Sequence, residues 1–580
     1  MLKGDLTLEL GDRVAAAVEA AFGLRITAEE AVIRAAAPDR PADYQCNAAF
    51  ALAKRVGAAP LAVAGEIASH LEADLVEPPV VAGAGFVNLT LRRSWLEGLL
   101  VRLQTDARLG VPPSARARRV VIDYGAPNIA KELHAGHLRS TVIGDAIARL
   151  LRFSGDEVIA QNHLGDWGTP FGMLLEHLVD LGWTQTGAEH SIRDLDALYK
   201  AARAKFNESP VFAERSRRRV VLLQGGDAGT LELWSELVAA SIQYFQHIYD
   251  VLGVLLRPED ARGESFYNPF LGDVVEELQA KGLLVESEGA LCVFPPGFKG
   301  RDGSPQPLIV RKSDGGFNYE ATDLAALRFR TQELHGEELL YVIQAAQHMR
   351  LQMLFATGRL AGWVTDAIDV QHVSFGALLG EDGKILKTRE GESVKLVDLI
   401  DEGIARARRI VEERSQLEDG EREEIARAVG IGALKYADLA GDRQKDHVFA
   451  WDRLLAMDGN TAVYLQYANA RIRSVIRRGG EEVAPGTRIV LGDPSERALG
   501  LRLAQFGGAV RSATEHLEPH RLCTHLYETA TAFTAFYERC SVLSAETDEL
   551  RQSRLALCGL TSRALILGLS LLGIEAPERL

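Results

Sequence analysis

Two histidines three residues apart, His134 and His137, stand where a strand-like pattern gives way to a helical one. Imidazoles at this spacing can face one side of a turn and donate hydrogen bonds to phosphoryl oxygens. The N-terminus of the following helix would add free N–H groups and the positive end of the helix dipole. Gly136 lies between them and has no side chain, so a flat base can lie against the backbone there. The segment therefore predicts a nucleotide-phosphate site.

Other interpretations of these residues stay open on the pattern alone. His134 and His137 could be surface residues, or they could ligate a metal ion with His163 as the third ligand. Gly136 could serve only the turn. The segment contains no GxGxxG sequence, which argues against a dinucleotide site.

The elements around the histidines form a strand–helix–strand unit. The β-branched run at 120–122 indicates a buried strand, and 158–160 indicates a second one. Apolar residues at helical spacing run from Leu138 to Leu151, and Gly155 ends that helix. Residues 339–343 and 370–375 look like later strands of the same sheet. Such units build a parallel α/β sheet, in which ligands bind at the carboxyl ends of the strands.

The rest of the chain divides around this unit. A Pro/Gly-rich joint at 110–114 closes a first part in which helical and strand-like patterns alternate. Residues 185–260 look helical, residues 283–319 look like hairpins, and the pattern after about residue 396 is helical nearly to the end. We predict domains at 1–110, at 115–395 with insertions at about 185–330, and at 396–580.

The composition is typical of a soluble globular protein. The chain has 580 residues, 47% of them hydrophobic and 25% charged. Its five cysteines form no Cys-x-x-Cys pair, which favours a reducing cytosol over a disulfide framework or a zinc finger. The closest approach to a membrane span, 564–574, is shorter than the roughly 18 residues needed. Early acidic residues argue against a secretory signal. We therefore expect a cytoplasmic protein that does not bind membranes.

A net charge of −15 by itself argues against nucleic-acid binding. A local basic patch can nevertheless bind phosphates, because fields are screened beyond about one Debye length. The candidate patches are three arginine clusters: Arg116, Arg118 and Arg119; Arg215 and Arg217–Arg219; and Arg471, Arg473, Arg477 and Arg478. Each of these clusters could equally be a solvated face.

The sequence HAGH at 134–137 resembles the HIGH signature of class I aminoacyl-tRNA synthetases. Pro-Asn-x-Ala-Lys at 127–131 and Asn-His-x-Gly-Asp-Trp-Gly at 162–168 resemble arginyl-tRNA synthetases specifically. Gly-Phe-Val-Asn-Leu-Thr at 85–90 is similar to the amino-terminal domain that contacts the tRNA elbow in this family. Lys-Asp-His-Val-Phe-Ala-Trp-Asp at 445–452 is similar to its anticodon-binding domain. The resemblance therefore covers nearly the whole chain.

This resemblance implies a fold and an activity. The fold is α/β: a Rossmann-like parallel-sheet catalytic domain, an amino-terminal α/β domain and a carboxyl-terminal all-α anticodon-binding bundle. The activity is that of an arginine–tRNA ligase, which forms arginyl-adenylate and pyrophosphate from L-arginine and ATP. The ligase then transfers arginine to the terminal adenosine of its tRNA. Mg²⁺ would accompany ATP, no structural metal is expected, and the protein would act as a monomer.

The resemblance also assigns residues to ATP. His134 and His137 would hydrogen-bond the transition state. The second class signature, KMSK, is degenerate here: residues 384–389 occupy its place, and Thr388 stands where its final lysine is usual. Lys131 would stand in for that lysine, and Lys387 of the degenerate signature would also be catalytic. In this family activation waits for tRNA. The expected ATP-binding residues come from both signatures: His134, Gly136, His137, Lys384, Lys387 and Arg389.

Arginine recognition needs carboxylates, because a guanidinium is a planar fork of donors that suits bidentate pairing. By resemblance, Asp323 and Glu264 face the guanidinium, with Tyr319 beside it. Tyr319 and Asp323 are four residues apart and so share one helix face. The amino and carboxylate end of arginine would be held by three further residues: Asp123, Asn128 and Gln347.

Some positions depart from the family pattern. Asp123 replaces a common glutamate, Gln344 a common glycine and Arg350 a common histidine. These changes keep two alternatives open: a specialised paralogue that charges tRNA for a biosynthetic or resistance pathway, and a non-catalytic tRNA-binding relative. The intact HAGH sequence, Lys131 and Asp323 argue against the second alternative.

Overall fold

The computed structural model describes residues 4–36, 42–72, 74–114, 116–182, 192–300, 302–387, 393–414, 418–480 and 483–580. At its centre is a five-stranded sheet of order β12-β11-β5-β6-β7, in which every pair is parallel. The strands are β5 (Arg119–Asp123), β6 (Glu157–Leu164), β7 (Ala261–Gly263), β11 (Glu338–Tyr341) and β12 (Asp369–His372). The predicted parallel sheet is confirmed.

The helix that carries the two histidines is α5 (Ala135–Ser154), between β5 and β6. It ends where Gly155 adopts φ 104°, a conformation that suits glycine, and the Gly155 N–H bonds back to the carbonyls of Leu151 and Arg152. Fourteen of its twenty residues are buried, because the sheet covers one face and carboxyl-terminal helices cover the other. Both the end of α5 and its orientation are thereby fixed.

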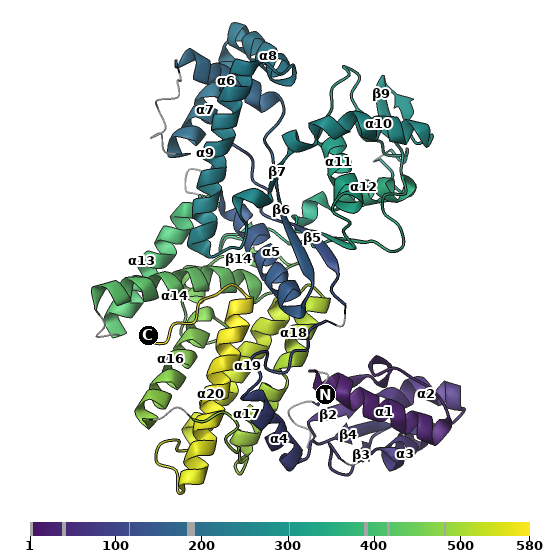
Figure 1. Ribbon diagram of the computed structural model, residues 1–580, viewed down its shortest axis with the longest axis vertical. Helices are drawn as coiled ribbons and strands as arrows, with labels where there is room; N and C mark the ends of the chain where they lie inside the picture. Colours follow the sequence, from purple (N-terminus) through teal and green to yellow (C-terminus); the bar gives the residue numbers. More distant parts are fainter. Residues whose placement is uncertain are drawn as a thin grey trace.

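The amino-terminal unit is a four-stranded antiparallel sheet with helices (purple in Figure 1). Its strands are β1 (Ile33–Ala35), β2 (Tyr44–Cys46), β3 (Val80–Ala82) and β4 (Phe86–Leu89). Its helices are α1 (Leu6–Phe22), α2 (Ala48–Val56) and α3 (Pro60–His70). Helix α4 (Arg93–Leu103) follows this unit in the chain and precedes β5 of the central sheet. Ion pairs of 2.6 Å from Arg497 to Asp43 and from Arg511 to Asp5 attach this unit to the carboxyl-terminal helices.

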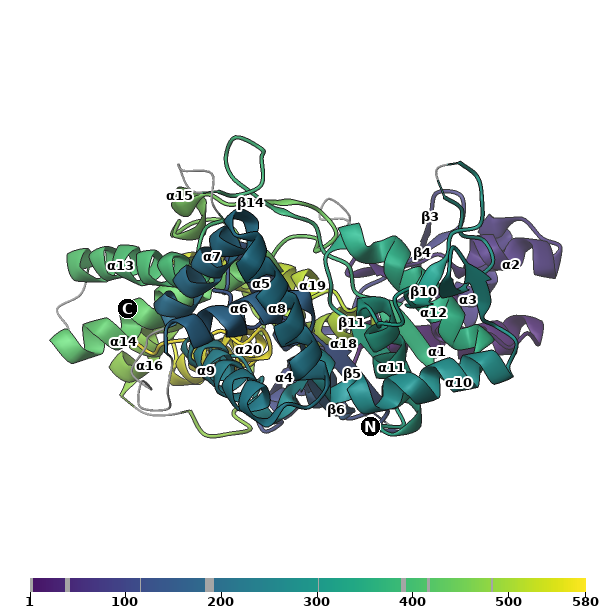
Figure 2. The ribbon, with the colours of Figure 1, turned by 90° about the horizontal axis from the view of Figure 1, so that it is seen from above.

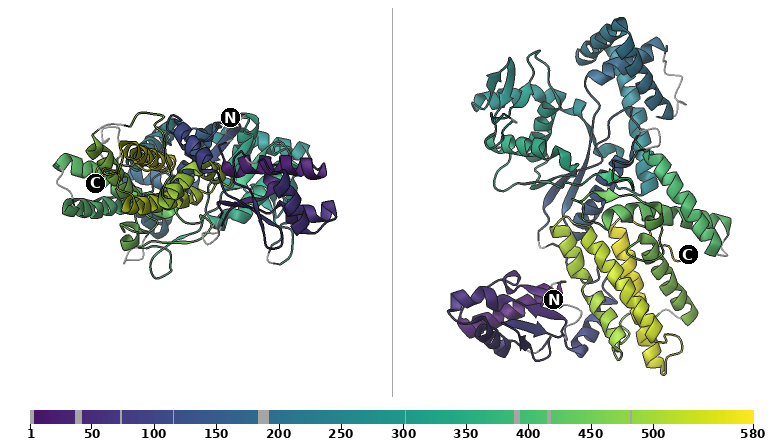
Figure 3. Two further views of the ribbon diagram at one scale, coloured as in Figure 1. Left: turned by 90° about the horizontal axis from the view of Figure 1, so that it is seen from below. Right: turned by 180° about the vertical axis from the view of Figure 1, so that it is seen from behind.

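Two insertions stand above the central sheet in the view of Figure 1. Figure 3 shows them from behind, on either side of the upper part of the molecule. The first consists of α6 (Thr169–Asp180), α7 (Ile192–Glu208), α8 (Pro210–Gln224) and α9 (Ala228–Leu252). The second contains η4 (Glu264–Phe270), α10 (Leu271–Ala280), β8 (Val285–Ser287), β9 (Ala290–Val293), β10 (Leu308–Arg311), α11 (Tyr319–Gln332) and α12 (His348–Leu360). Strands β8 to β10 form the antiparallel sheet predicted as hairpins.

The carboxyl-terminal part is helical, as predicted, apart from the two-residue strand β14 (His447–Val448), which pairs with β13 (Leu378–Leu379). Seen from above, α13 and the amino-terminal unit lie at opposite sides of the molecule (Figure 2). The helices are α13 (Leu396–Arg414), α14 (Asp419–Leu439), α15 (Trp451–Leu454), α16 (Ala462–Gly479), α17 (Pro494–Ala504), α18 (Phe506–Glu515), α19 (His520–Arg539) and α20 (Asp548–Leu571).

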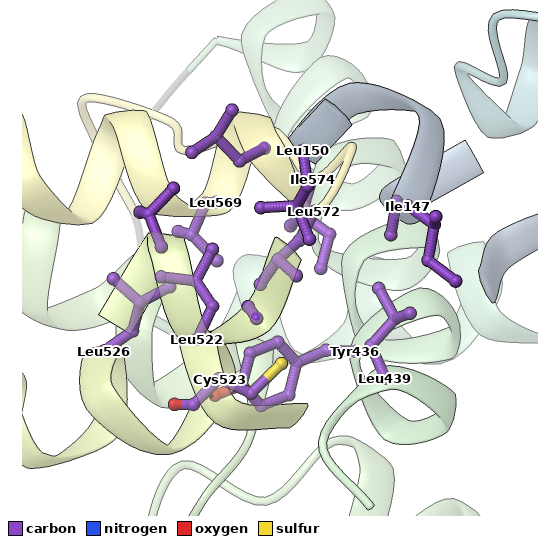
Figure 4. Close-up of a cluster of buried hydrophobic side chains, with 14 of the residues drawn as sticks. Ile147, Leu150, Tyr436, Leu439, Leu522, Cys523, Leu526, Leu569, Leu572 and Ile574 are labelled. Carbon is purple, nitrogen blue, oxygen red and sulfur yellow. Dashed lines mark hydrogen bonds between the residues drawn. The ribbon is translucent and has the colours of Figure 1, made fainter. Parts of the chain in front are cut away.

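A continuous hydrophobic core joins α5 to this bundle (Figure 4). The buried ion pair of Arg139 and Asp438, 2.8 Å apart, crosses the same boundary. The histidine-bearing helix is therefore held by the bundle as well as by the sheet. The side chains that meet in the core come from α5, α14, α19 and the end of α20: Ile147, Leu150, Tyr436, Leu439, Leu522, Cys523, Leu526, Leu569, Leu572 and Ile574.

Among the described residues, α20 is the one single helix long and apolar enough to cross a membrane. However, 67% of its apolar window is buried inside the protein. It packs on α16 and α19, so its hydrophobicity is accounted for by the core of the bundle.

Candidate active site

A cavity of about 730 Å³ opens at the carboxyl ends of β5, β6 and β11. A larger cavity of about 940 Å³ lies between α9, α14 and the carboxyl-terminal segment, and none of the predicted site residues lines it. Lys131, Lys384 and Lys387 do not line the 730 Å³ cavity. Nine of the predicted site residues do line it: Asp123, Asn128, His134, Gly136, His137, Glu264, Tyr319, Asp323 and Gln347.

The two histidines cap α5, and their rings lie against one another at a tilt of 40°. The Nδ1 atom of His134 accepts the N–H of Gly136, and the Nδ1 atom of His137 accepts the N–H of His134, each at 3.1 Å. Their ring centres are 3.9 Å apart. Because both Nδ1 atoms accept hydrogen bonds, each neutral ring carries its proton on Nε2. Each ring therefore has an Nε2–H donor.

The charge state of the histidines follows from their surroundings. Burial, followed by the charge of Lys131, lowers the pKa of His134. Burial, with a smaller effect from His134, lowers the pKa of His137 to about 3. His137 is therefore neutral at physiological pH, and the lowered pKa of His134 favours its neutral form as well.

Gly136 has a structural role that the sequence did not reveal. A Cβ atom at this position would lie 2.9 Å from Cε1 and 3.0 Å from Nδ1 of the His134 ring. The direction that a side chain would take at Gly136 is thus occupied by the His134 ring. A side chain here would displace the capping ring.

The loop between β5 and α5 is held by side chains from α5 itself, from β6 and from α9. Ser140 accepts the N–H of Gly125 at 3.0 Å, Asn162 accepts that of Ala126 at 2.9 Å, and Ser241 accepts that of Ala130 at 3.1 Å. Ala126 and Ala130 adopt positive φ angles of 49° and 59°. Positive φ angles are unfavourable for alanine, so the three hydrogen bonds hold the loop in a strained conformation. The loop in turn places Asn128 at the cavity.

Two carboxylates, Glu264 and Asp323, form an acidic corner of the cavity. Asp166 holds the segment that carries Glu264, because it accepts both the N–H and the hydroxyl of the next residue, Ser265, at 2.8 and 2.5 Å. Burial, then the negative charges of Asp323 and Asp166, raise the pKa of Glu264 to about 7. His163, considered from sequence only as a metal ligand, lies with its Nε2 4.0 Å from Oδ1 of Asp323. This corner favours a cationic ligand.

Arg350 already reaches into the acidic corner. Its Nη1 donates to Oδ2 of Asp323, and its Nε donates to Oε1 of Gln347 at 3.0 Å. Its Cζ lies 5.4 Å from the ring centre of Tyr319. The sequence identified Arg350 only as a departure from the family pattern, and its contact with Asp323 was not predicted.

One of the two carboxylate oxygens of Asp123 is bonded to a second arginine, Arg330. Its Oδ2 accepts from Nη2 of Arg330 at 2.8 Å, and Nε of Arg330 donates to Gln161 at 2.6 Å. Both partners of the pair are almost fully buried. Oδ1 of Asp123 has no hydrogen-bond partner among the described residues. One buried acceptor on the cavity wall therefore remains for a ligand, and Arg330 is a wall residue that the sequence missed.

The second signature is joined to the first by backbone pairing. Lys387 pairs with Ser393, and the N–H of Ala135 donates to the carbonyl of Val394 at 2.8 Å. Lys384 and Lys387 are exposed, and Arg389 lies outside the described residues. The ammonium of Lys131 lies 5.0 Å from the Tyr199 ring centre, away from the cavity lining.

The metal-ligand alternative lacks a third ligand. Within the part of the chain that the structure describes, no group of three or more His, Cys, Asp or Glu side chains could hold a metal ion. Trp167, in the segment 162–168, packs edge-on against Trp234 at the margin of the core, with 5.7 Å between ring centres.

Three family models match successive parts of the chain. Residues 8–91 match the arginyl tRNA synthetase N terminal domain, and residues 101–451 match the class I (R) tRNA synthetase catalytic domain. Residues 465–580 match the DALR anticodon binding domain.

Individual proteins resemble the chain over nearly its full length. The arginine–tRNA ligase of Thermobifida fusca is 50% identical, over 98% of this chain and 99% of its own. That of Synechococcus elongatus is 47% identical, over 99% of each. The arginyl-tRNA synthetase structure from Plasmodium falciparum superimposes with a TM-score of 0.86 at 28% identity, over 100% of both chains. That from Thermus thermophilus gives 0.79 at 27% identity, over 99% of this chain and 100% of its own.

Proposed function

The chain belongs to the arginyl-tRNA synthetase family, and we propose that it uses ATP to attach L-arginine to its tRNA. In the first step the arginine carboxylate attacks the α-phosphorus of ATP and pyrophosphate leaves. In the second step a ribose hydroxyl of the tRNA's terminal adenosine takes the arginyl group. The observation that carries this function is that one cavity is lined both by the two histidines that cap the N-terminus of α5 and by the acidic corner.

The phosphate end of the reaction is assigned to His134 and His137. Their Nε2–H donors stand at the N-terminus of α5, where the helix dipole also favours negative charge. Charge develops on the phosphoryl oxygens as pyrophosphate leaves, so fixed donors there stabilise the transition state more than the ground state. Gly136 supports this role by leaving room for the His134 ring.

The guanidinium end is assigned to Asp323 and Glu264, with Tyr319 beside them. Two carboxylates can accept the forked donors of a guanidinium, whereas the ammonium of lysine is a single point charge. The raised pKa of Glu264 supports this assignment, because burial and then the charges of Asp323 and Asp166 disfavour its ionised form, which a guanidinium would stabilise. A substrate guanidinium would supply the missing positive charge.

The α-amino and carboxylate groups of arginine are assigned to Asp123, Asn128 and Gln347. The unpaired Oδ1 of Asp123 is an acceptor for the α-ammonium group. Asn128 stands on the anchored loop close to Gly165, where a Cβ atom would collide with its Oδ1. These residues come from the ends of different elements, and so the carboxylate could be oriented toward the α-phosphorus.

Lysines outside the cavity complete the proposed ATP site. Lys131, Lys384, Lys387 and Arg389 have long basic side chains, and we assign them to the phosphates of bound ATP. Mg²⁺ arrives as part of the ATP substrate, bound mainly through phosphate oxygens. We expect no metal bound by the protein alone.

The order of the three matched family models supports separate roles for three successive parts of the chain. We assign residues 1–110 to the tRNA elbow, 115–395 to catalysis, with insertions at about 185–330, and 396–580 to the stem and anticodon. The catalytic family model itself runs on to residue 451. We further propose a cytoplasmic monomer that does not bind membranes.

ATP–pyrophosphate exchange measured with and without arginine tRNA tests this function. An active synthetase of this kind should exchange pyrophosphate with arginine when tRNA is present and negligibly without it, since tRNA completes the site. Robust exchange without tRNA would contradict tRNA-dependent activation. Exchange driven by an arginine analogue in preference to arginine would favour the specialised paralogue. No exchange under any condition, with tRNA still bound, would favour the non-catalytic relative.

A further inference from the structure

Arg350 stands where a ligand guanidinium is expected. It lies in the first turn of α12 and lines the cavity with its side chain 27% exposed. Its guanidinium contacts Asp323 and Gln347 and lies over the face of Tyr319. These are three of the residues assigned to substrate arginine. The chain thus places its own guanidinium against the recognition residues.

The two partners of this ion pair differ in how firmly they are held. Asp323 projects from the second turn of α11, a helix whose neighbouring residues Thr322 and Leu324 are buried. Arg350 reaches it through a long side chain with several rotatable bonds. The pair lies on a cavity wall with side chains 27% and 19% exposed, so solvent screens it in part and the long side chain must be ordered to form it. Arg350 can therefore leave Asp323 without any change in the backbone.

The surroundings explain why a cation is held there. Asp323 from α11, Glu264 from η4 and Asp166 after β6 all bring carboxyl groups to this corner, and His163 of β6 stands 4.0 Å from Asp323. Arg350 is the positive group that opposes them, and its charge acts against the rise in the pKa of Glu264. In the empty site Asp323 would otherwise be an unpaired charge in a partly buried position, and its ion pair with Arg350 avoids that unfavourable state.

We propose that Arg350 is a substrate-mimicking residue, which occupies the guanidinium position in the empty site and must leave Asp323 before substrate arginine can pair with it. This inference rests on the proposed function, in which Asp323 receives the substrate guanidinium. Arg350 then sets the affinity for arginine: only molecules with Arg350 displaced are competent to bind.

The size of the effect follows from that competition. The apparent dissociation constant is the intrinsic one divided by the fraction of molecules in which Asp323 is available. A displaced fraction of about one tenth makes binding about ten-fold weaker than in a protein without the competing guanidinium. Every ligand that pairs with Asp323 must find Arg350 displaced, so the affinity of each ligand is lowered by the same factor. Arginine and methylguanidine should therefore be affected by equal factors, although methylguanidine lacks the amino-acid end.

The test compares Arg350→Gln with the matched control Arg359→Gln. Arg359 is exposed in the last turn of the same helix, so its replacement removes the same charge away from the cavity lining. Arginine binding is measured by calorimetry on the full chain, methylguanidine by competition against arginine, and folding by thermal unfolding. Arg350→Gln should tighten both ligands about ten-fold. ATP binding should not change, and Arg359→Gln should bind like the wild type.

Three results would overturn the inference. Folded Arg350→Gln that binds arginine no more tightly than the wild type shows that Arg350 does not compete. Tighter arginine binding with unchanged methylguanidine binding shows that it acts on the amino-acid end. Equal tightening in Arg359→Gln shows a general effect of charge. Asp323→Asn separates this failure from that of the proposed function. If that variant binds arginine as well as the wild type does, the guanidinium position itself is wrong.

Discussion

Lowering the pH from about 8 to about 6 should weaken arginine binding through Glu264. Burial, Asp323 and Asp166 raise the pKa of its carboxyl group to about 7. With that pKa the group is ionised in roughly nine tenths of molecules at about pH 8 and one tenth at about pH 6. The substrate guanidinium is a cation and favours the ionised form. Affinity is therefore full above the pKa and falls as Glu264 is protonated, by about ten-fold over this range.

Calorimetry at both pH values, in two buffers with different ionisation heats, measures the affinity and the protons released. At about pH 6, close to one proton should leave for each arginine bound, because binding drives Glu264 to ionise. The variant Glu264→Gln should bind more weakly at about pH 8, with no pH dependence from this group and no such proton release. A wild-type affinity that is flat between these pH values, or a release that persists in Glu264→Gln, would refute the reasoning.

Other predictions follow from the same geometry. His134→Ala or His137→Ala should each lower the rate of arginine activation in pyrophosphate exchange by about a hundred-fold while calorimetry finds arginine binding unchanged; unchanged exchange in both would remove the histidines from the phosphate site. Asp323→Asn should weaken arginine binding by about a hundred-fold or more and leave ATP binding intact, as titration of the two ligands will show. Arg139→Met leaves Asp438 buried without its partner, 2.8 Å away in the wild type, and should destabilise the protein by about 3–5 kcal/mol. A urea midpoint equal to that of the wild type would contradict that last prediction.

The sequence predicted the central fold well where its signals were local. The run of Val120 to Ile122 formed β5, helical spacing formed α5, and Gly155 ended that helix in a left-handed conformation. Two-residue strands such as β14 were missed, because they are too short to carry a period and form only by pairing with a distant segment. The exact domain boundaries stay predictions.

The site was predicted mainly from family resemblance, since no local pattern marks Asp323 or Glu264 as ligands. The structure brings these two residues into the cavity with the histidines. Arg330 and Arg350 were not predicted as partners of Asp123 and Asp323. Arg330 is 207 residues from Asp123 in sequence, and nothing in a helical arginine's neighbours reveals such a partner. Gly136 shows the same limit, because its contact with the His134 ring depends on how that ring caps α5.

Charging of arginine tRNA measures the proposed ligase activity itself. The full chain is incubated with ATP, Mg²⁺, an arginine tRNA transcript and labelled arginine, lysine or citrulline in parallel. We expect arginine to become attached to the tRNA through an alkali-labile ester, and lysine and citrulline not to, because neither can satisfy both carboxylates of the acidic corner. Absence of arginyl-tRNA from protein that still binds ATP and arginine, or faster charging with another amino acid, would contradict this expectation.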